Sequence, residues 1–549
     1  MKHNLLKILT ALAVIILFNR CAQIGVLNGG PRDQTPPKLL EATPELKSLQ
    51  FNSALITLKF DENIQLRDLN NQLVISPKLK TKPEIIANGK KLTIKLVPEE
   101  LLPNTTYRFY FGKSIADMHE GNPLTNFSYI ISTGTIIDSL NIKGTVTNAL
   151  DQVKEKDLVV GLYFNKNLTD SFAFKNTPDY VTRTNEYGQF ELNNLPKDEF
   201  KLICFTDKNK DYLYNGADNE QISFLSEDIK LQTDSSFKLN LFKEIPTKTY
   251  IKKVIMSENG KGLVLFNQKT VSNVMSFIDE RSKDVYQLHK DRESDTCEFF
   301  YKQFKDTIWL KVGYGNGTNK LIDTLKLKVP VLKYKYRQII KTQSDLLSGK
   351  LGYNNDPVIA LSQWIDTSKT DLKRIHLYSK TDTSVNRSPV KIKWMNGHTF
   401  KIENTIKPKQ QYFLKIDTAC FIGYNGSIND SIKFPFTKQS KSELGSLILK
   451  VTFNKKQSYV VQLINSANKI VKERNVSFSL SASNTTSITF KDMEEDTYKI
   501  RIIYDDNEDK VWNTGNYLKS IQPEKTYIFE KGIKILPDWE IEEEFILRE

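Results

Sequence analysis

Short stretches that alternate between apolar and polar residues follow one another along the chain from position 39 onward. The stretch LITLKF at 55–60 alternates from Ile56 onward, and KLTIKLVP at 91–98 alternates as far as Leu96 and stops at Pro98. Turn-forming pairs such as Asn-Gly and Pro-Asn separate these stretches about every ten residues. Because side chains of a strand point alternately to its two faces, the pattern predicts antiparallel β-sandwiches rather than β-α-β units.

The first group of predicted strands, at 38–135, carries several short motifs in a fixed order. They are Pro36-Pro37, FDE at 60–62, ISP at 75–77, LPNTTY at 102–107, IADMHEGNPL at 115–124 and Thr133-Gly134. In their order and spacing these motifs resemble a bacterial Ig-like domain of the S-layer and surface-protein type. The resemblance implies an antiparallel sandwich in this part of the chain.

Residues 139–243 form a second predicted unit. SLNIKGTV at 139–146 opens it, and strands with turns at Gly188 and Pro196 follow. This unit resembles the transthyretin-like or carboxypeptidase-regulatory-like sandwiches, which implies a non-catalytic spacer of the kind found in surface proteins. A divergent β-sandwich is predicted after it, at 247–331.

Both units recur later in the chain. SLNIKGTV returns as SLILKVTF at 446–453, and DKNKDYLYN at 207–215 returns as DDNEDKVWN at 505–513. Pro103 and Tyr107 match Pro408 and Tyr412. The repeats predict a second Ig-like domain at 350–438 and a second transthyretin-like sandwich at 445–549, so the expected fold class is all-β. Such modules in series, with small interfaces between neighbours, are expected to form a rod or a curved arm.

Length and charge narrow the classes of function. The 549 residues fit several domains rather than one core, because domains usually contain about 100–200 residues. The 78 basic and 65 acidic residues give a formal net charge of +13. This balance favours anionic partners such as phosphorylated lipids, acidic glycans or nucleic acid without choosing among them.

The first twenty residues have the layout of a secretory signal. Lys2 and Lys7 precede the apolar run ILTALAVIILF at 8–18, which is shorter than the roughly 20 residues of a spanning helix. The run is followed by Cys21, and the arrangement resembles a bacterial lipoprotein signal of the looser type found in Bacteroidota. The resemblance implies a signal peptide at 1–20, acylation of Cys21 and anchoring in the outer membrane. A Gly- and Pro-rich tether is expected at 21–37.

The sequence carries little sign of catalysis. It lacks a GxSxG turn, a glycine-rich phosphate loop and histidines at the spacing of a zinc hydrolase. The five histidines are scattered, and paired carboxylates are too common in any charged surface to mark a glycosidase. The cysteines after Cys21 are expected to pack as small hydrophobic residues in strands; they are Cys204, Cys297 and Cys420.

Two repeated acidic loops are candidate calcium sites, because calcium takes six to eight oxygen ligands. The candidate ligands are Asp207, Asn209, Asp211 and Asp218 in the first loop and Asp505, Asn507 and Asp509 in the second. The alternative is a structural turn in which Asp and Asn side chains cap their own backbone. Tyr212 and Lys510 stand where a helix-loop-helix calcium site has Gly, and no other cofactor is expected.

Two further surface features suggest partners or modification. The stretch KYKYR at 333–337, with the cluster Lys78, Lys80 and Lys82, is expected to be an exposed strand or a contact for lipopolysaccharide phosphates or an acidic glycan. Five sites fit the D-[ST]-[AILVMT] pattern that resembles the O-glycosylation site of Bacteroidota: Ser139, Thr307, Thr324, Thr418 and Ser431.

The sequence therefore predicts a non-catalytic outer-membrane lipoprotein that acts as a scaffold or interaction arm. Its expected partner is another outer-membrane protein, such as a transport or assembly β-barrel, and not nucleic acid. One alternative is a glycan- or lipopolysaccharide-binding module, which would need an exposed aromatic platform such as Trp364, Trp394 or Trp512. Another is an envelope hydrolase. The sequence does not indicate whether the protein faces the periplasm or the cell surface.

Overall fold

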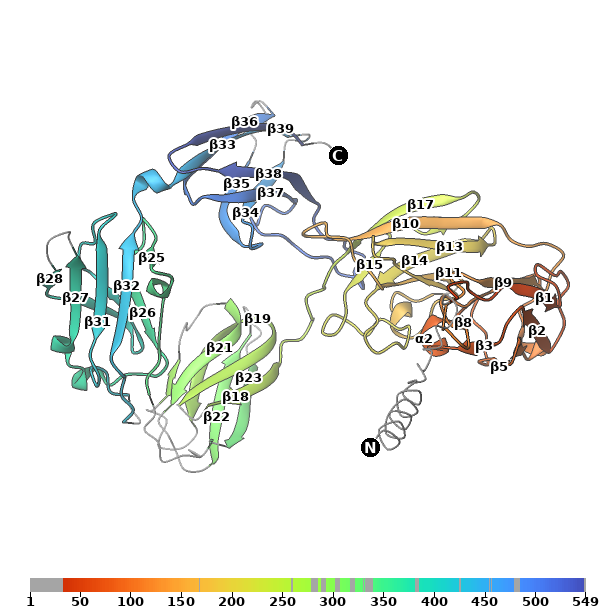
Figure 1. Cartoon of the computed structure of the whole chain (residues 1–549), viewed down its shortest axis with the longest axis horizontal. Helices are drawn as coiled ribbons and strands as arrows, with labels where there is room; N and C mark the ends of the chain where they lie inside the picture. The colour runs from red at the N-terminus through yellow and green to blue at the C-terminus, as the bar shows by residue number, and fades with distance from the viewer. Residues whose placement is uncertain are drawn as a thin grey trace, which may run out of the picture. The chain divides into compact units, whose positions relative to one another are not determined.

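The computed structural model is built almost wholly of β-strands (Figure 1). It describes residues 33–166, 168–257, 260–277, 285–287, 293–301, 307–315, 321–328, 330, 339–380, 385–423, 426–453, 455, 457–477 and 484–547. We divide the described strands into five groups, modules 1 to 5, in chain order. Contacts separate the chain into two compact units, one of which holds module 1 with Asp179–Val181 and Asn193–Lys197, and the other the rest.

Module 1 comprises nine strands in three antiparallel groups, β1-β2-β6-β5, β4-β7-β9 and β3-β8. The strand predicted from alternation at 55–60 is β2, and its residues Ile56, Leu58 and Phe60 are buried. The elements are β1 Leu39–Thr43, β2 Leu55–Phe60, β3 Ile64–Leu66, α2 Leu69–Gln72, β4 Val74–Ser76, β5 Glu84–Asn88, β6 Lys91–Lys95, η1 Pro98–Glu100, β7 Thr106–Tyr110, β8 Ile115–Asp117 and β9 Ser128–Ser132.

Module 2 has one sheet of order β13-β10-β17 and a second of order β12-β11-β14-β15, to which β16 adds by pairing with β14. The first and last strands, β10 and β17, are parallel neighbours. The elements are β10 Leu140–Asn148, β11 Val159–Phe164, η2 Phe172–Phe174, β12 Tyr180–Arg183, β13 Gln189–Leu195, β14 Glu199–Phe205, β15 Ile222–Phe224, β16 Ile229–Lys230 and β17 Ser235–Leu241.

Module 3 is organised around one long strand, β19. The first part of β19 pairs with β18 and β21, and its last part pairs with β22. Alternate residues of β21 and β22, among them Phe299 and Leu310, are buried in one core. The strands are β18 Ile251–Met256, β19 Lys261–Phe277, β20 Val285–Gln287, β21 Glu293–Tyr301, β22 Thr307–Tyr314 and β23 Leu321–Lys328.

Module 4 contains a sheet of order β24-β26-β30-β29 and a second of order β25-β32-β31-β27-β28, with a shared core. The elements are β24 Thr342–Ser344, η4 Asp345–Ser348, β25 Lys350–Leu351, β26 Val358–Leu361, η5 Thr367–Lys369, η6 Leu372–Arg374, β27 Ile375–Lys380, β28 Val385–Ser388, β29 Ile392–Asn396, β30 Thr399–Ile402, β31 Gln411–Ile416 and β32 Ile432–Lys438. The short helix η7 Lys441–Glu443 follows.

Module 5 repeats the strand order of module 2. Its sheets have the orders β36-β33-β39 and β35-β34-β37-β38, and its first and last strands are again parallel neighbours. The strands are β33 Gly445–Thr452, β34 Ser458–Ile464, β35 Ile470–Val476, β36 Thr485–Met493, β37 Asp496–Asp505, β38 Thr526–Ile535 and β39 Glu540–Ile546. Strand by strand, β10 to β15 correspond to β33 to β38, and β17 corresponds to β39.

Modules 1 and 4 each contain the same kind of hydrogen bond, at positions that the sequence repeat matches. The hydroxyl of Tyr107 accepts the backbone N–H of Leu102 at 2.8 Å, and that of Tyr412 accepts the N–H of Lys407 at 3.1 Å. In both cases the two residues are five positions apart, so the tyrosine closes the turn before its own strand. The prediction of an all-β fold made of tandem sandwiches is confirmed.

Candidate functional site

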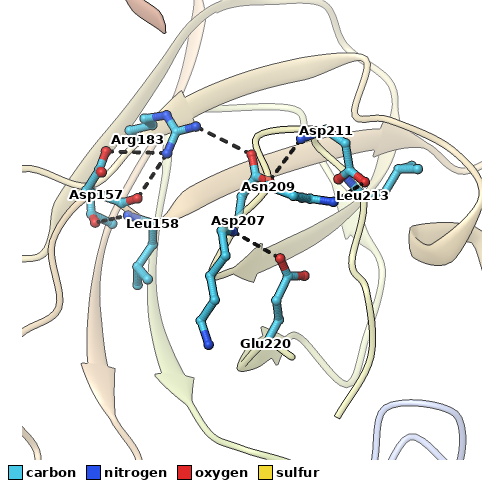
Figure 2. A network of polar contacts seen from close by, with 10 residues as sticks. Asp157, Leu158, Arg183, Asp207, Asn209, Asp211, Leu213 and Glu220 are labelled. Carbon is cyan, nitrogen blue, oxygen red and sulfur yellow. Dashed lines mark hydrogen bonds and ion pairs between the residues drawn. The ribbon is translucent and has the colours of Figure 1, made fainter. Parts of the chain in front are cut away.

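The first acidic loop connects β14 to β15 in module 2. One carboxylate oxygen of Asp207 accepts the N–H of Asp211 at 3.1 Å, and the other lies 3.5 Å from the guanidinium of Arg183 (Figure 2). Arg183, at the end of β12, also donates to the backbone oxygen of Asp157 at 3.1 Å. The side chain of Asp207 is buried, so Arg183 supplies the positive charge that a buried carboxylate needs.

Asn209 and Asp211 complete this loop with hydrogen bonds to each other and to the backbone. The Asn209 amide donates to Asp211 Oδ2 at 2.7 Å, and Asp211 Oδ1 accepts the N–H of Leu213 at 2.8 Å. Burial alone would raise the pKa of Asp211, but the N–H of Leu213 and the amides of Asn215 and Asn209 lower it overall. These contacts are those of a turn capped by its own side chains.

A buried glutamate that the sequence analysis did not single out holds both ends of the loop. Glu220 accepts the N–H of Lys208 at 3.1 Å through Oε1 and the N–H of Asn215 at 2.7 Å through Oε2. Burial raises the pKa of Glu220, although the two backbone donors act in the opposite direction. Glu220 therefore acts as a bridge between two backbone segments of the same loop.

The second acidic loop, between β37 and β38 of module 5, repeats this arrangement. Asn507 donates to Asp509 Oδ2 at 3.1 Å, and Asp509 Oδ1 accepts the N–H of Val511 at 3.0 Å. Glu524 accepts the N–H groups of Asp506 and Asn513 at 3.0 and 2.8 Å. Glu524 thus has the role of Glu220. The sequence feature that could have indicated both glutamates is that each follows the second Asn of its loop, Asn215 or Asn513, although at different spacings.

The two loops differ at their first aspartate. Asp505 Oδ2 accepts the N–H of Lys510 at 3.2 Å, whereas Oδ1 is buried with no hydrogen-bond partner among the described residues. In module 2 the matching carboxylate has Arg183 beside it.

The predicted calcium ligands are only partly brought together. Asp218 accepts a hydrogen bond from Asn267 of β19 at 3.1 Å, and no contact joins it to the other candidates in the described part of the chain. Across the described residues, no group of three or more His, Cys, Asp or Glu side chains is placed to hold a metal ion. The contacts present are those of the alternative that the sequence left open, a structural turn.

The three tryptophans named as candidates for a glycan platform are each in contact with other groups of the protein. The Trp364 ring lies 5.5 Å from that of Phe300, and the Trp394 ring lies 5.3 Å from that of Phe400. Trp512 Nε1 donates to the backbone oxygen of Glu524 at 3.0 Å. All three are partly buried because they serve packing and loop closure, whereas the exposed tryptophans are Trp309 and Trp539, at 48% and 60%.

The five candidate glycosylation residues occupy separate places. Ser139, Thr324, Thr418 and Ser431 are exposed, and Thr307, the first residue of β22, is half-buried. Asp417, which precedes Thr418, pairs with Lys415 and His376, both at 2.9 Å, and these two contacts lower its pKa. Whether any of the five hydroxyls is modified stays a prediction.

The remaining candidates concern cysteines and the basic stretch. Cys204, Cys297 and Cys420 are buried, and burial raises the pKa of the Cys420 thiol to about 12. Cys21 and the stretch at 333–337 lie outside the described residues. Lys82 of the cluster Lys78, Lys80 and Lys82 is exposed and donates to Asn70 at 2.6 Å. Among the described helices, none combines the length and apolar character needed to cross a membrane.

Comparison with known proteins identifies one domain. No curated protein matches the chain. The S-layer protein rSbsC(31-844) aligns over 90% of this chain and 67% of its own, with 10% identity and a TM-score of 0.15. BcpA, the major pilin subunit of Bacillus cereus, aligns over 75% and 99%, with 9% identity and a TM-score of 0.14. The N-terminal four Ig domains of Dscam1 isoform 8.4 align over 72% and 97%, with 5% identity and a TM-score of 0.17. Residues 33–133 match the family described as bacterial Ig-like domain, and this segment is therefore such a domain.

Proposed function

We propose that this protein is a non-catalytic scaffold or interaction arm of the cell envelope. The observation that carries the proposal is that acidic side chains of the two loops serve the fold. Asp207, Glu220 and Glu524 each accept a hydrogen bond from the backbone of a sandwich loop. Groups engaged in this way are not arranged to act on a substrate. A series of β-sandwiches around such loops offers strand edges and loops to another protein instead.

The proposal includes a lipid anchor at Cys21 in the outer membrane. It is supported by the apolar run at 8–18, which Asn19 and Arg20 separate from the cysteine, and by the Gly- and Pro-rich segment after it. Several acyl chains, at about 0.8 kcal/mol per buried methylene, would hold a folded protein on a membrane. We expect Cys21→Ala to move the protein to the soluble fraction and to abolish incorporation of labelled palmitate, while a Gln23→Ala control stays bound. Membrane retention of Cys21→Ala without label would contradict the anchor.

The partner proposed is another outer-membrane protein, such as a transport or assembly β-barrel. Crosslinking in intact envelopes followed by affinity purification should recover one membrane protein in stoichiometric amount. Binding on a glycan array with no protein partner would contradict the scaffold and favour a glycan-binding module. Trp364, Trp394 and Trp512, the residues considered for glycan binding, are engaged in packing and loop closure, so their contacts do not support that second function.

A further inference from the structure

The loop between β37 and β38 of module 5 is longer than its counterpart in module 2. Asn215 and Glu220 are five positions apart, whereas Asn513 and Glu524, which make the same hydrogen bond, are eleven positions apart. The longer loop forms a small hairpin, in which Asn516 and Ile521 exchange backbone hydrogen bonds of 2.8 and 2.9 Å. We call residues 514–523 the hairpin. The hairpin is the main local difference between the two loops, in each of which one glutamate accepts two backbone N–H groups.

The hairpin places Tyr517 among four aromatic rings of module 2. The Tyr517 ring lies 5.6 to 6.1 Å from each of them, centroid to centroid, and its side chain is only 6% exposed. Such distances are those of favourable offset and edge-to-face ring contacts. We call these four rings the socket; they are Phe172, Phe174, Tyr214 and Phe224.

Polar contacts fix the orientation of the hairpin in the socket. The buried carboxylate of Glu244 accepts the N–H of Tyr517 at 2.6 Å and the hydroxyl of Tyr214 at 2.5 Å. Burial, and then the neighbouring Glu244, raise the pKa of Tyr214, so its hydroxyl remains a donor. Thr514 donates to the backbone oxygen of Lys243 at 2.8 Å.

Further contacts on both sides of Tyr517 extend the interface. Gln522 donates to the backbone oxygen of Phe224 at 2.9 Å, and Thr526 donates to that of Ala149 at 2.6 Å. Gly515 lies so close to module 2 that a Cβ atom there would be 2.6 Å from the ring of Phe242. A side chain at position 515 would therefore push the hairpin away from module 2.

We propose that the hairpin is a clasp, and that the socket of module 2 is an interaction surface whose occupant is the last module of the same chain. Tyr517, Thr514 and Gln522, which make most of the contact, belong to the insertion that module 5 has and module 2 lacks. The clasp covers aromatic rings that would otherwise be a hydrophobic patch on module 2. Because modules 2 and 5 are then in contact, both ends of the chain segment that carries modules 3 and 4 are fixed. In a simple series of modules, modules 2 and 5 would not be in contact. This proposal does not depend on the identity of any external partner.

A crosslink across the clasp tests the proposal in the full chain. In a Lys243→Cys, Thr514→Cys double variant, a short bismaleimide should join the two positions and give a faster-migrating monomer band on denaturing gels. Each single variant is the control for crosslinks between the introduced cysteine and a native cysteine. A band of dimer size would place the contact between two copies, and the absence of any crosslink would leave the socket without this occupant. Either result would overturn the proposal.

Two more variants show whether Tyr517 carries the contact. Adding Tyr517→Ala should lower the crosslink yield at least about tenfold, while Leu518→Ala, whose side chain is 49% exposed on the same hairpin, should leave it unchanged. An unchanged yield with Tyr517→Ala would contradict the proposal. If Tyr517→Ala does not fold, residues 514–523 can be replaced by GADN, the residues at 216–219, which keeps Asn513 and Glu524. Amides at 214–224 should then exchange faster, and unchanged exchange would equally overturn the clasp.

Discussion

One buried carboxylate in module 1, Asp117, organises the loop after its strand. It accepts the N–H groups of Glu120, Gly121 and Asn122 at 2.6, 3.0 and 2.6 Å. Burial alone would raise the pKa of Asp117, but these backbone donors lower it overall. The motif that carried the resemblance to an Ig-like domain thus contains an aspartate whose role is to hold three backbone amides.

The lowered pKa of Asp117 predicts a pH-dependent effect of Asp117→Asn. A carboxyl group with a depressed folded-state pKa contributes stability above its unfolded pKa of about 3.8, and this contribution is lost as the pH falls through the folded-state value. We therefore expect Asp117→Asn to lower the melting temperature at pH 7 and the difference from the wild type to shrink below pH about 4. Circular dichroism from pH 7 to 3 measures both. The exposed Glu99→Gln is the control, and a constant difference would contradict the assignment.

Glu220 and Glu524 should each contribute to the stability of their own module. Replacement by Gln leaves one good acceptor oxygen for two backbone N–H groups, so one buried donor loses its partner. We expect each variant to lose about 1–3 kcal/mol of unfolding free energy. Urea unfolding measures this loss. The exposed Glu227→Gln in module 2 should stay within about 0.5 kcal/mol of the wild type, and equal effects of Glu220→Gln and Glu227→Gln would argue against the bridging role.

Removal of calcium should have little effect on the protein. The loop carboxylates are engaged by backbone and amide donors, so we expect EDTA to shift the melting temperature by less than about 2 °C. Differential scanning fluorimetry with EDTA and with added calcium measures the shift. The unpartnered Oδ1 of Asp505 makes the second loop the place to look for an exception. A large calcium-dependent shift that disappears in Asp505→Asn would show that this loop binds the ion.

At the scale of elements, the last strand of the chain completes module 5. β39 pairs in parallel with β33 from Ser446–Glu540 to Thr452–Ile546, and it brings Phe545 and Leu547 into buried positions. A chain that ends before Glu540 loses this pairing and both buried side chains. Since loss of one such side chain costs about 2–5 kcal/mol, we expect module 5 to become sensitive to protease. A chain that ends at Leu547 is the control, and equal resistance of the two truncations would show that β39 is dispensable.

Local pattern predicts the strands better than the contacts between them. Alternation at 55–60 predicted β2 because successive side chains of a strand point to opposite faces, of which only one faces the core. Trp364 and Trp394, which a glycan platform would need at the surface, are partly buried against Phe300 and Phe400, because composition does not indicate which face a tryptophan occupies. Glu220 and Glu524 were missed because glutamates are common and these two differ in spacing. Tyr517 was missed since its partners are hundreds of positions away.

At the scale of the whole molecule, the sequence predicted small interfaces between neighbouring modules only. The contacts of Tyr517 and Gln522 with module 2 differ from that expectation, because modules 2 and 5 are not neighbours in the chain. Two folded modules that share buried rings and hydrogen bonds no longer have independent stabilities. A substitution that destabilises one of these modules should therefore also lower the stability of the other.

Ile502→Ala tests this coupling. Ile502 of β37 is fully buried in the core of module 5, so its truncation should cost that module about 2–5 kcal/mol. If the clasp couples the modules, amides near the socket in module 2, at 170–176 and 214–224, should also exchange faster, because the hairpin that covers them opens with module 5. Hydrogen exchange of the full chain measures both regions. With GADN in place of 514–523, the effect of Ile502→Ala should be confined to module 5. Equal exchange near the socket with and without Ile502→Ala in the wild-type loop would mean that modules 2 and 5 unfold independently.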